Sequence, residues 1–214
     1  KSSHVASSTS RTRRRRRRPV WPRRNFEADT VVEFDFARTY HQKTDVKPNG
    51  KWYSMGDAWH RWGDVSMGNY LHRLVLKPGV LCRLSPRGTG RASNGSTSGC
   101  VLVLATRKDV TRFNQIYGRR VHNSYHMVDW ASVANDYAGI EFRNYERIVT
   151  RLRQDNQRRM KAAGVTKWTD LFKLLWYYTI DASSGCVWDL RVVVRQWPLS
   201  HLSIHLTDLT STLI

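Results

Sequence analysis

Six consecutive arginines, Arg13 to Arg18, are the residues in this sequence most suited to a specific chemistry. A guanidinium group stays charged at all physiological pH values and donates in a planar fork that matches the oxygens of a phosphate. The block lies in an N-terminal segment, Lys1 to Arg24, that contains ten Lys or Arg residues and no Asp or Glu. Trp21 flanks these arginines and is suited either to stacking on bases or to anchoring the segment to the rest of the protein. The candidate nucleic-acid-binding residues are Arg11, Arg13, Arg14, Arg15, Arg16, Arg17, Arg18, Trp21, Arg23 and Arg24.

This basic segment cannot fold by itself, because its like charges repel and it has few apolar side chains to offset the entropy of ordering. A polyanion would neutralise it, which favours packaging of nucleic acid. The alternative interpretations are a nuclear-import or nucleolar signal, which is compatible with packaging, and a patch for a membrane or heparin.

Other candidate chemistry is weaker. His122 and His126 have the i, i+4 spacing of two metal ligands on a helix, but neither a third ligand nor the glutamate of an HExxH motif accompanies them. The carboxylates of Asp129, Asp136, Glu141 and Glu146 belong to no motif and are expected to neutralise arginines. Neither a phosphate-binding GxxxxGK[ST] loop nor a nucleophile motif such as GxSxG is present. We therefore expect no enzyme activity, no metal and no cofactor.

Composition predicts one folded domain behind the basic segment. The chain has 214 residues, a formal net charge of +19, 40% hydrophobic residues and nine tryptophans, which allow a real core. No apolar run is long enough to span a membrane. Cys82, Cys100 and Cys186 are far apart and odd in number, so we expect buried free thiols, no disulfide, and a reducing intracellular environment.

The elements that must position this chemistry read mainly as strands. Alternating or continuous apolar residues predict strands at Val31 to Tyr40, Tyr70 to Lys77, Val80 to Leu84, Cys100 to Thr106, Arg147 to Arg153 and Cys186 to Arg195. Leu171 to Ile180 fits either a strand or a helix, and its aromatic and branched residues favour a strand. Ser85 to Gly99 is rich in Gly and Ser and predicts a long loop, and Asp155 to Ala163 predicts one short helix. Seven or eight strands without a βαβ rhythm predict an all-β antiparallel sandwich or barrel.

Three stretches resemble the capsid proteins of circoviruses and related small circular single-stranded DNA viruses. They are Tyr70 to Pro86 (YLHRLVLKPGVLCRLSP), Gly99 to Asp109 (GCVLVLATRKD) and Trp188 to Trp197 (WDLRVVVRQW). The resemblance implies a single antiparallel jelly roll of about eight strands with short helices in its loops. It also implies a small icosahedral shell with the basic arm inside and the long loops outside. Satellite viruses and other small RNA viruses share this layout.

The resulting domain prediction has three parts: residues 1–29 as the nucleic-acid-binding arm, 30–198 as the jelly-roll shell domain, and 199–214 as a C-terminal strand or arm. The predicted function is that of a capsid protein that self-assembles and packages a single-stranded genome, with DNA favoured and RNA possible. Its expected partners are copies of itself and the host nuclear import machinery, and its expected locations are the virion and the host nucleus. The alternative is a ribosomal or ribonucleoprotein component with a basic tail that threads through RNA.

Overall fold

The computed structural model describes residues 23–28, 32–56, 58–59, 70–84, 99–121, 125–163 and 174–201. Most of the predicted arm, nearly all of the predicted loop at Ser85 to Gly99, and the predicted C-terminal segment beyond His201 lie outside the described residues.

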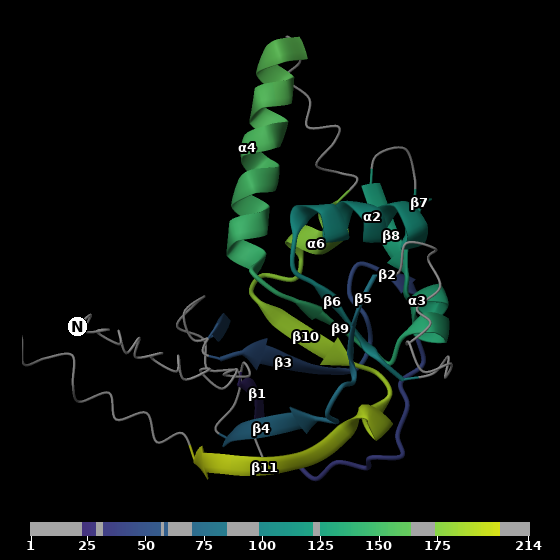
Figure 1. Ribbon diagram of the computed structural model, residues 1–214, viewed down its shortest axis with the longest axis vertical. Coiled ribbons are helices and arrows are strands. Elements are labelled where there is room, and N and C mark those ends of the chain that lie inside the picture. The colour runs from purple at the N-terminus through teal and green to yellow at the C-terminus, as the bar shows by residue number, and fades with distance from the viewer. Residues whose placement is uncertain are drawn as a thin grey trace, which may run out of the picture.

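The main sheet has eight strands and curls strongly on itself (Figure 1). Its order is β11-β4-β1-β3-β10-β9-β6-β5. All pairings from β11 to β9 are antiparallel, whereas β9 with β6 and β6 with β5 are parallel. The strands span Arg24–Ala28 (β1), Lys51–Met55 (β3), Tyr70–Leu76 (β4), Leu81–Arg83 (β5), Val101–Leu104 (β6), Gly139–Phe142 (β9), Ser184–Val187 (β10) and Val193–His201 (β11).

A second, three-stranded sheet and four helices complete the described fold. The small sheet has the order β2-β8-β7 and is built from Thr44–Asp45 (β2), Gly118–Val121 (β7) and Tyr125–Asp129 (β8). The helices are Arg107–Tyr117 (α2), Trp130–Asp136 (α3), Tyr145–Ala163 (α4) and Leu175–Tyr178 (α6), and a short 3-10 helix, Leu190–Val192 (η1), precedes β11.

The predicted all-β antiparallel jelly roll is therefore wrong, and the fold is mixed α/β. Parallel strands need a long crossover connection, and the chain between β6 and β9 provides one that contains α2, β7, β8 and α3. The sequence could have predicted the start of α2, because Thr106 and Asp109 form a capping box directly after the buried strand β6.

Helix α4 also replaces a predicted strand at Arg147 to Arg153. The branched residues Ile148 and Val149 favoured a strand, but the buried positions of α4 recur at helical spacing. They are Tyr145, Ile148, Val149 and Asn156. The helix also extends the short one predicted at Asp155 to Ala163 toward its N-terminus, to Tyr145. Similarly, Leu171 to Ile180, predicted as a strand, contains the short helix α6.

The predicted strand Cys186 to Arg195 is not one strand in the structure, because β10 ends at Val187 and a turn separates it from β11. Leu190 and Val192 are buried and Arg191 is exposed, as the alternation predicts. However, these three residues form η1, and β11 begins only at Val193. After this turn Val193 is buried, whereas Val194 is 53% exposed. Arg195 is also exposed, so the alternation is interrupted between Val193 and Arg195, where the pairing with β4 has a register shift.

Aromatic side chains fill the larger of two hydrophobic clusters. Phe113 packs against both Trp130 and Trp176, with ring centroids 5.8 and 5.2 Å apart, and Trp130 also contacts Trp188. All four are at most 3% exposed. Three of the nine tryptophans therefore stabilise the core of the single chain, by apolar area and ring contacts.

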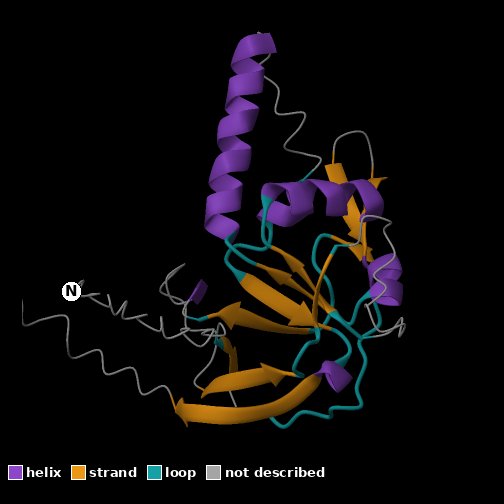
Figure 2. Ribbon diagram, in the orientation of Figure 1, coloured by secondary structure: helices purple, strands orange, loops and turns teal. Residues whose placement is uncertain are grey.

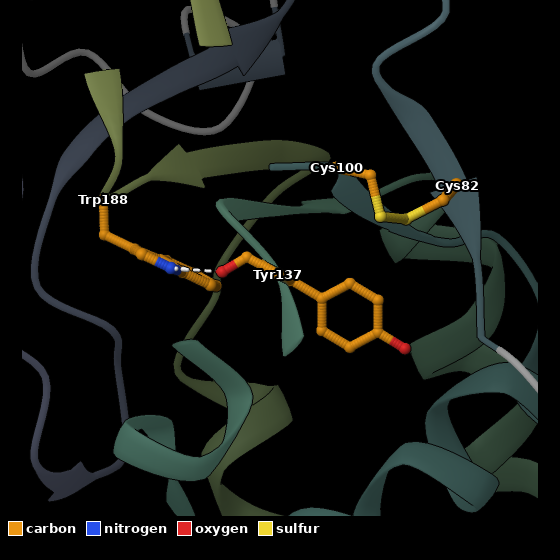
Figure 3. Close-up of a disulfide and its surroundings, with 4 residues drawn as sticks. All are labelled: Cys82, Cys100, Tyr137 and Trp188. Atoms are coloured by element: carbon orange, nitrogen blue, oxygen red, sulfur yellow. Dashed lines mark hydrogen bonds between the residues drawn. A yellow bond between two sulfur atoms is a disulfide. The ribbon is translucent and has the colours of Figure 1, made fainter. Parts of the chain in front are cut away.

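Cys82 in β5 and Cys100 before β6 form a disulfide, with the two Cα atoms 5.9 Å apart (Figure 3). The predicted absence of disulfides is wrong at this pair, because the parallel pairing of β5 with β6 brings together cysteines 18 residues apart. Because Cys82 and Cys100 form a disulfide, the cysteines no longer support the predicted reducing environment. Cys186 is free and buried, as predicted, and burial raises the pKa of its thiol well above the ordinary value.

We expect Cys82→Ser to lower the free energy of unfolding by about 3 kcal/mol, because the disulfide closes a loop of 18 residues in the unfolded chain. Urea unfolding followed by tryptophan fluorescence measures this. With excess dithiothreitol the wild type should become as unstable as the variant. Equal stability of the two without reductant would contradict a formed disulfide.

Candidate nucleic-acid interface

The basic arm joins the folded body at strand β1. Arg23 is exposed, and its carbonyl accepts a hydrogen bond from the amide of Gly56 at 2.6 Å. Strand β1 then pairs with β3 on one side and β4 on the other. Of the predicted binding residues, Arg11, Arg13 to Arg18 and Trp21 lie outside the described residues, and Arg23 and Arg24 lie within them. The root of the arm is therefore an internal strand of the sheet.

Arg24 differs from its predicted role. Its side chain is 8% exposed, and its Nε donates to Glu141 Oε1 at 2.6 Å. This guanidinium is already bound to a carboxylate inside the sheet, so it is not a phosphate ligand in this structure. Sequence reasoning missed this because Glu141 lies 117 residues away in the chain.

Glu141 is fully buried and has three hydrogen-bonding partners. Besides Arg24, it accepts from the Tyr53 hydroxyl at 3.1 Å, and its Oε2 accepts from Arg143 Nε and a terminal nitrogen at 2.9 and 2.6 Å. Burial and the negative charge of Glu141 raise the pKa of Tyr53 well above its ordinary value. Burial would lower the pKa of Arg24, but Glu141 and Tyr53 outweigh it and the pKa is raised. Both side chains thus keep their protons.

The same carboxylate links the arm to helix α4. Arg143 lies two residues before α4 begins at Tyr145. The first turn is tied to the segment before β10, because Ser183 Oγ accepts from the Tyr145 amide at 3.0 Å and donates to Glu146 at 3.0 Å. Glu146 also lies where the helix dipole favours a negative charge. The path Arg24–Glu141–Arg143 therefore fixes the root of the arm close to the root of α4.

Helix α4 has two opposite faces. Its buried side includes Tyr145, Ile148, Val149 and Asn156, with Leu152 packed against the core. At 100° per residue, a second set of exposed residues lies on the opposite side of the helix. We call this set the basic stripe, and it consists of Arg147, Arg151, Gln154, Arg158 and Lys161.

The C-terminal turns of α4 extend beyond the two sheets (Figure 2). From Arg147 to Lys161 the stripe runs about 21 Å along the helix. Asp155 pairs with Arg107 of α2 and with Arg158, 2.9 Å away, which braces the helix against α2. Arg153, away from the stripe, lies over the ring of Tyr178 at 5.7 Å. Four exposed cations thus project from the body on one helix face, as an electrostatic footprint for phosphates would require.

The predicted carboxylates mostly have structural roles. Asp129 caps α3, and hydrogen bonds from Ser132 lower its pKa despite partial burial, with Arg119 adding to the effect. Asp136 accepts from the Tyr117 hydroxyl at 2.6 Å, and burial and this bond raise the pKa of Tyr117. His126 lies in β8, and His122 is outside the described residues. Within the described part of the chain, no three His, Cys, Asp or Glu side chains are grouped so that they could hold a metal ion.

The comparisons with known proteins assign this chain to no family. No family model, no curated protein and no solved structure matches it. Among the helices of the described ranges, none is long and apolar enough to cross a membrane.

We expect Arg24→Met to lower the free energy of unfolding by about 3 kcal/mol, since it leaves the buried carboxylate of Glu141 with one cation instead of two. Urea unfolding measures the difference. Arg23→Met is the matched control, because Arg23 is exposed and its removal should change stability by less than about 0.5 kcal/mol. Equal losses at the two positions would show that Arg24 does not anchor β1.

Proposed function

We propose that this protein is a structural protein that packages single-stranded nucleic acid. The arginine-rich arm, with Arg11, Arg13 to Arg18 and Arg23, neutralises phosphates without reading sequence. The basic stripe of α4 binds a further stretch of the same strand. The observation that supports this most directly is the buried Arg24–Glu141–Arg143 network, which fixes the arm root beside the helix that presents the stripe.

Rigid placement of the arm root matters because a tethered ligand binds in proportion to its effective concentration. A nucleic-acid strand that is bound by the arm already lies close to Arg147 and Arg151. Its binding to the basic stripe therefore costs little additional entropy. Charge is the common element: α4 contains six Lys or Arg against two acids. The protein's net charge of +19 adds long-range attraction for any polyanion.

Two forms of packaging are compatible with this site. One is a capsid protein whose copies enclose a viral genome, in the host nucleus and the virion; DNA is the favoured genome and nuclear import the expected route. The mixed α/β sheet removes the jelly roll as an argument for it. The other is a ribonucleoprotein component, which the basic helix α4, projecting from a mixed α/β body, favours. Negative-stain electron microscopy of protein purified with its nucleic acid separates them, since only the first gives uniform closed particles.

Replacing Arg13 to Arg18 by serine should reduce the slope of log affinity against log salt by about 4, because each phosphate contact on a single strand contributes about 0.7. Fluorescence anisotropy with a labelled 20-nucleotide single strand at several salt concentrations measures the slope. A change of less than about 1 would show that the block contacts few phosphates. Replacement by lysine should keep most of the slope, since the charge remains and only the guanidinium fork is lost.

The stripe is tested by two double variants of equal charge. Arg147→Gln with Arg151→Gln should reduce the slope by about 1.4. Arg153→Gln with Arg159→Gln removes the same charge from α4 but away from the stripe, and should change the slope by less than about 0.5. Equal effects would mean that α4 contributes only general charge. The same anisotropy titrations provide both values.

A further inference from the structure

A cavity of about 190 Å³ lies at the opposite end of β10 from the root of α4. Ser183, which holds the first turn of α4, precedes β10, whereas Trp188 and Asp189 follow it. The four residues of β10 thus separate the cavity from the α4 root by about 13 Å. Its walls come from the segment before β2, the end of α3 and the start of η1, and include Tyr40, Gly99, Ala134, Trp188, Asp189 and Arg191.

The walls of this cavity are fixed in place. Trp188 Nε1 donates to the Tyr137 carbonyl at 2.7 Å, as Figure 3 shows, and the Tyr40 amide donates to the Trp188 carbonyl at 2.7 Å. Gly99 is followed by Cys100, which the disulfide holds to β5 and whose carbonyl accepts from the Ala138 amide at 2.8 Å. The cavity is therefore largely preformed, as small-ligand sites usually are.

One arginine, Arg191, lines the cavity, and a second, Arg38, contacts the wall residue Tyr40. The guanidinium of Arg38 is 4.6 Å from the centre of the Tyr40 ring, a cation–π contact. Arg191 lines the cavity and donates from Nε and a terminal nitrogen to the two oxygens of Asp189, at 2.9 and 2.8 Å. This fork fixes the direction of Arg191, and both arginines are exposed. Aromatic and alanine side chains (Tyr40, Tyr137, Trp188, Ala134 and Ala138) line much of this cavity beside the Asp189–Arg191 pair, which suits a flat, uncharged ring.

We propose that this cavity holds one unpaired nucleobase of the bound single strand against the Tyr40 ring, with the exposed side chains of Arg38, which lies over that ring, and Arg191, which is paired with Asp189, near the flanking phosphates. Its volume corresponds to about six water molecules, below the roughly 300–1,000 Å³ of sites for drug-sized ligands. It therefore accommodates a single ring system and not a whole nucleotide. Every base can stack on an aromatic ring, so the site would bind the nucleic-acid strand without selecting its sequence. The inference rests on the proposed packaging of single-stranded nucleic acid and adds a base contact to its phosphate contacts.

The test uses the full-length protein and a 20-nucleotide single strand, intact or with every base removed, in anisotropy titrations. Ala134→Phe places a ring in the cavity, whereas Ala131→Phe, on an exposed position of the same helix, is the matched control. Stacking of one base contributes about 1–3 kcal/mol. We therefore expect Ala134→Phe to weaken binding of the intact strand about tenfold and to leave the base-free strand and the salt slope unchanged. The control should match the wild type.

Photocrosslinking of the wild type to a 5-iodouracil strand, with the attached residue identified by mass spectrometry, needs no substitution. Attachment at Tyr40, the most exposed of the aromatic residues that line the cavity, is expected. Unchanged binding by folded Ala134→Phe, or crosslinks confined to aromatic residues away from this cavity, would overturn the base site while leaving the packaging proposal intact. If the wild type showed no salt-dependent binding to either strand, the packaging proposal itself would fail.

Discussion

The buried carboxylate of Glu141 is the constraint on which the arrangement of this protein depends. An ionised carboxylate inside a protein is tolerated only when charges and hydrogen bonds replace its water. Three neighbouring strands cooperate to meet this need: Tyr53 on β3 and Glu141 on β9 both pair with Gly185 on β10. A Cβ at position 185 would overlap the Tyr53 ring. Glycine there lets the Tyr53 side chain cross β10 and reach the carboxylate.

The two arginines bound to Glu141 give the network a second role besides stabilising the sheet, which is to connect two distant segments of the chain. Arg24 comes from the first described strand and Arg143 from the approach to α4. A sheet centre filled with apolar residues would be at least as stable, but it would not tie these two segments to one point. In the proposed function, this one acid, through Arg24, orders the attachment of the nine other arm charges, which cannot order themselves.

The sequence predicted some of the features that depend on neighbours in the chain, although the strand predicted at Val31 to Tyr40 is wrong, since the described residues there form only an isolated bridge at Thr39. The strands at Tyr70 to Lys77, Val80 to Leu84 and Cys100 to Thr106 are β4, β5 and β6 within one or two residues at most ends. Local patterns did not reveal which strands pair, because register and direction are set by contacts far apart in sequence. The parallel pairing of β5 with β6, the Cys82–Cys100 disulfide and the Arg24–Glu141 pair all follow from such contacts. For the site, the sequence identified the basic arm but not the stripe, because Ile148 and Val149 masked a helical spacing.

Among the described residues, the distribution of aromatic side chains bears on how copies of this chain could contact one another. Trp130, Trp176 and Trp188 are buried in the core. These three side chains therefore cannot make the aromatic contacts that large protein interfaces favour. Among the described residues, the large exposed hydrophobic side chains are Phe36 and Val194. Val194 lies on β11, an edge strand of the main sheet that also contains Arg195 and Pro198 and has irregular register with β4. Charge, proline and irregular pairing all discourage edge-to-edge association. In the proposed packaging, the described surfaces therefore offer few apolar contacts between copies, and the nucleic acid would supply a larger share of the assembly.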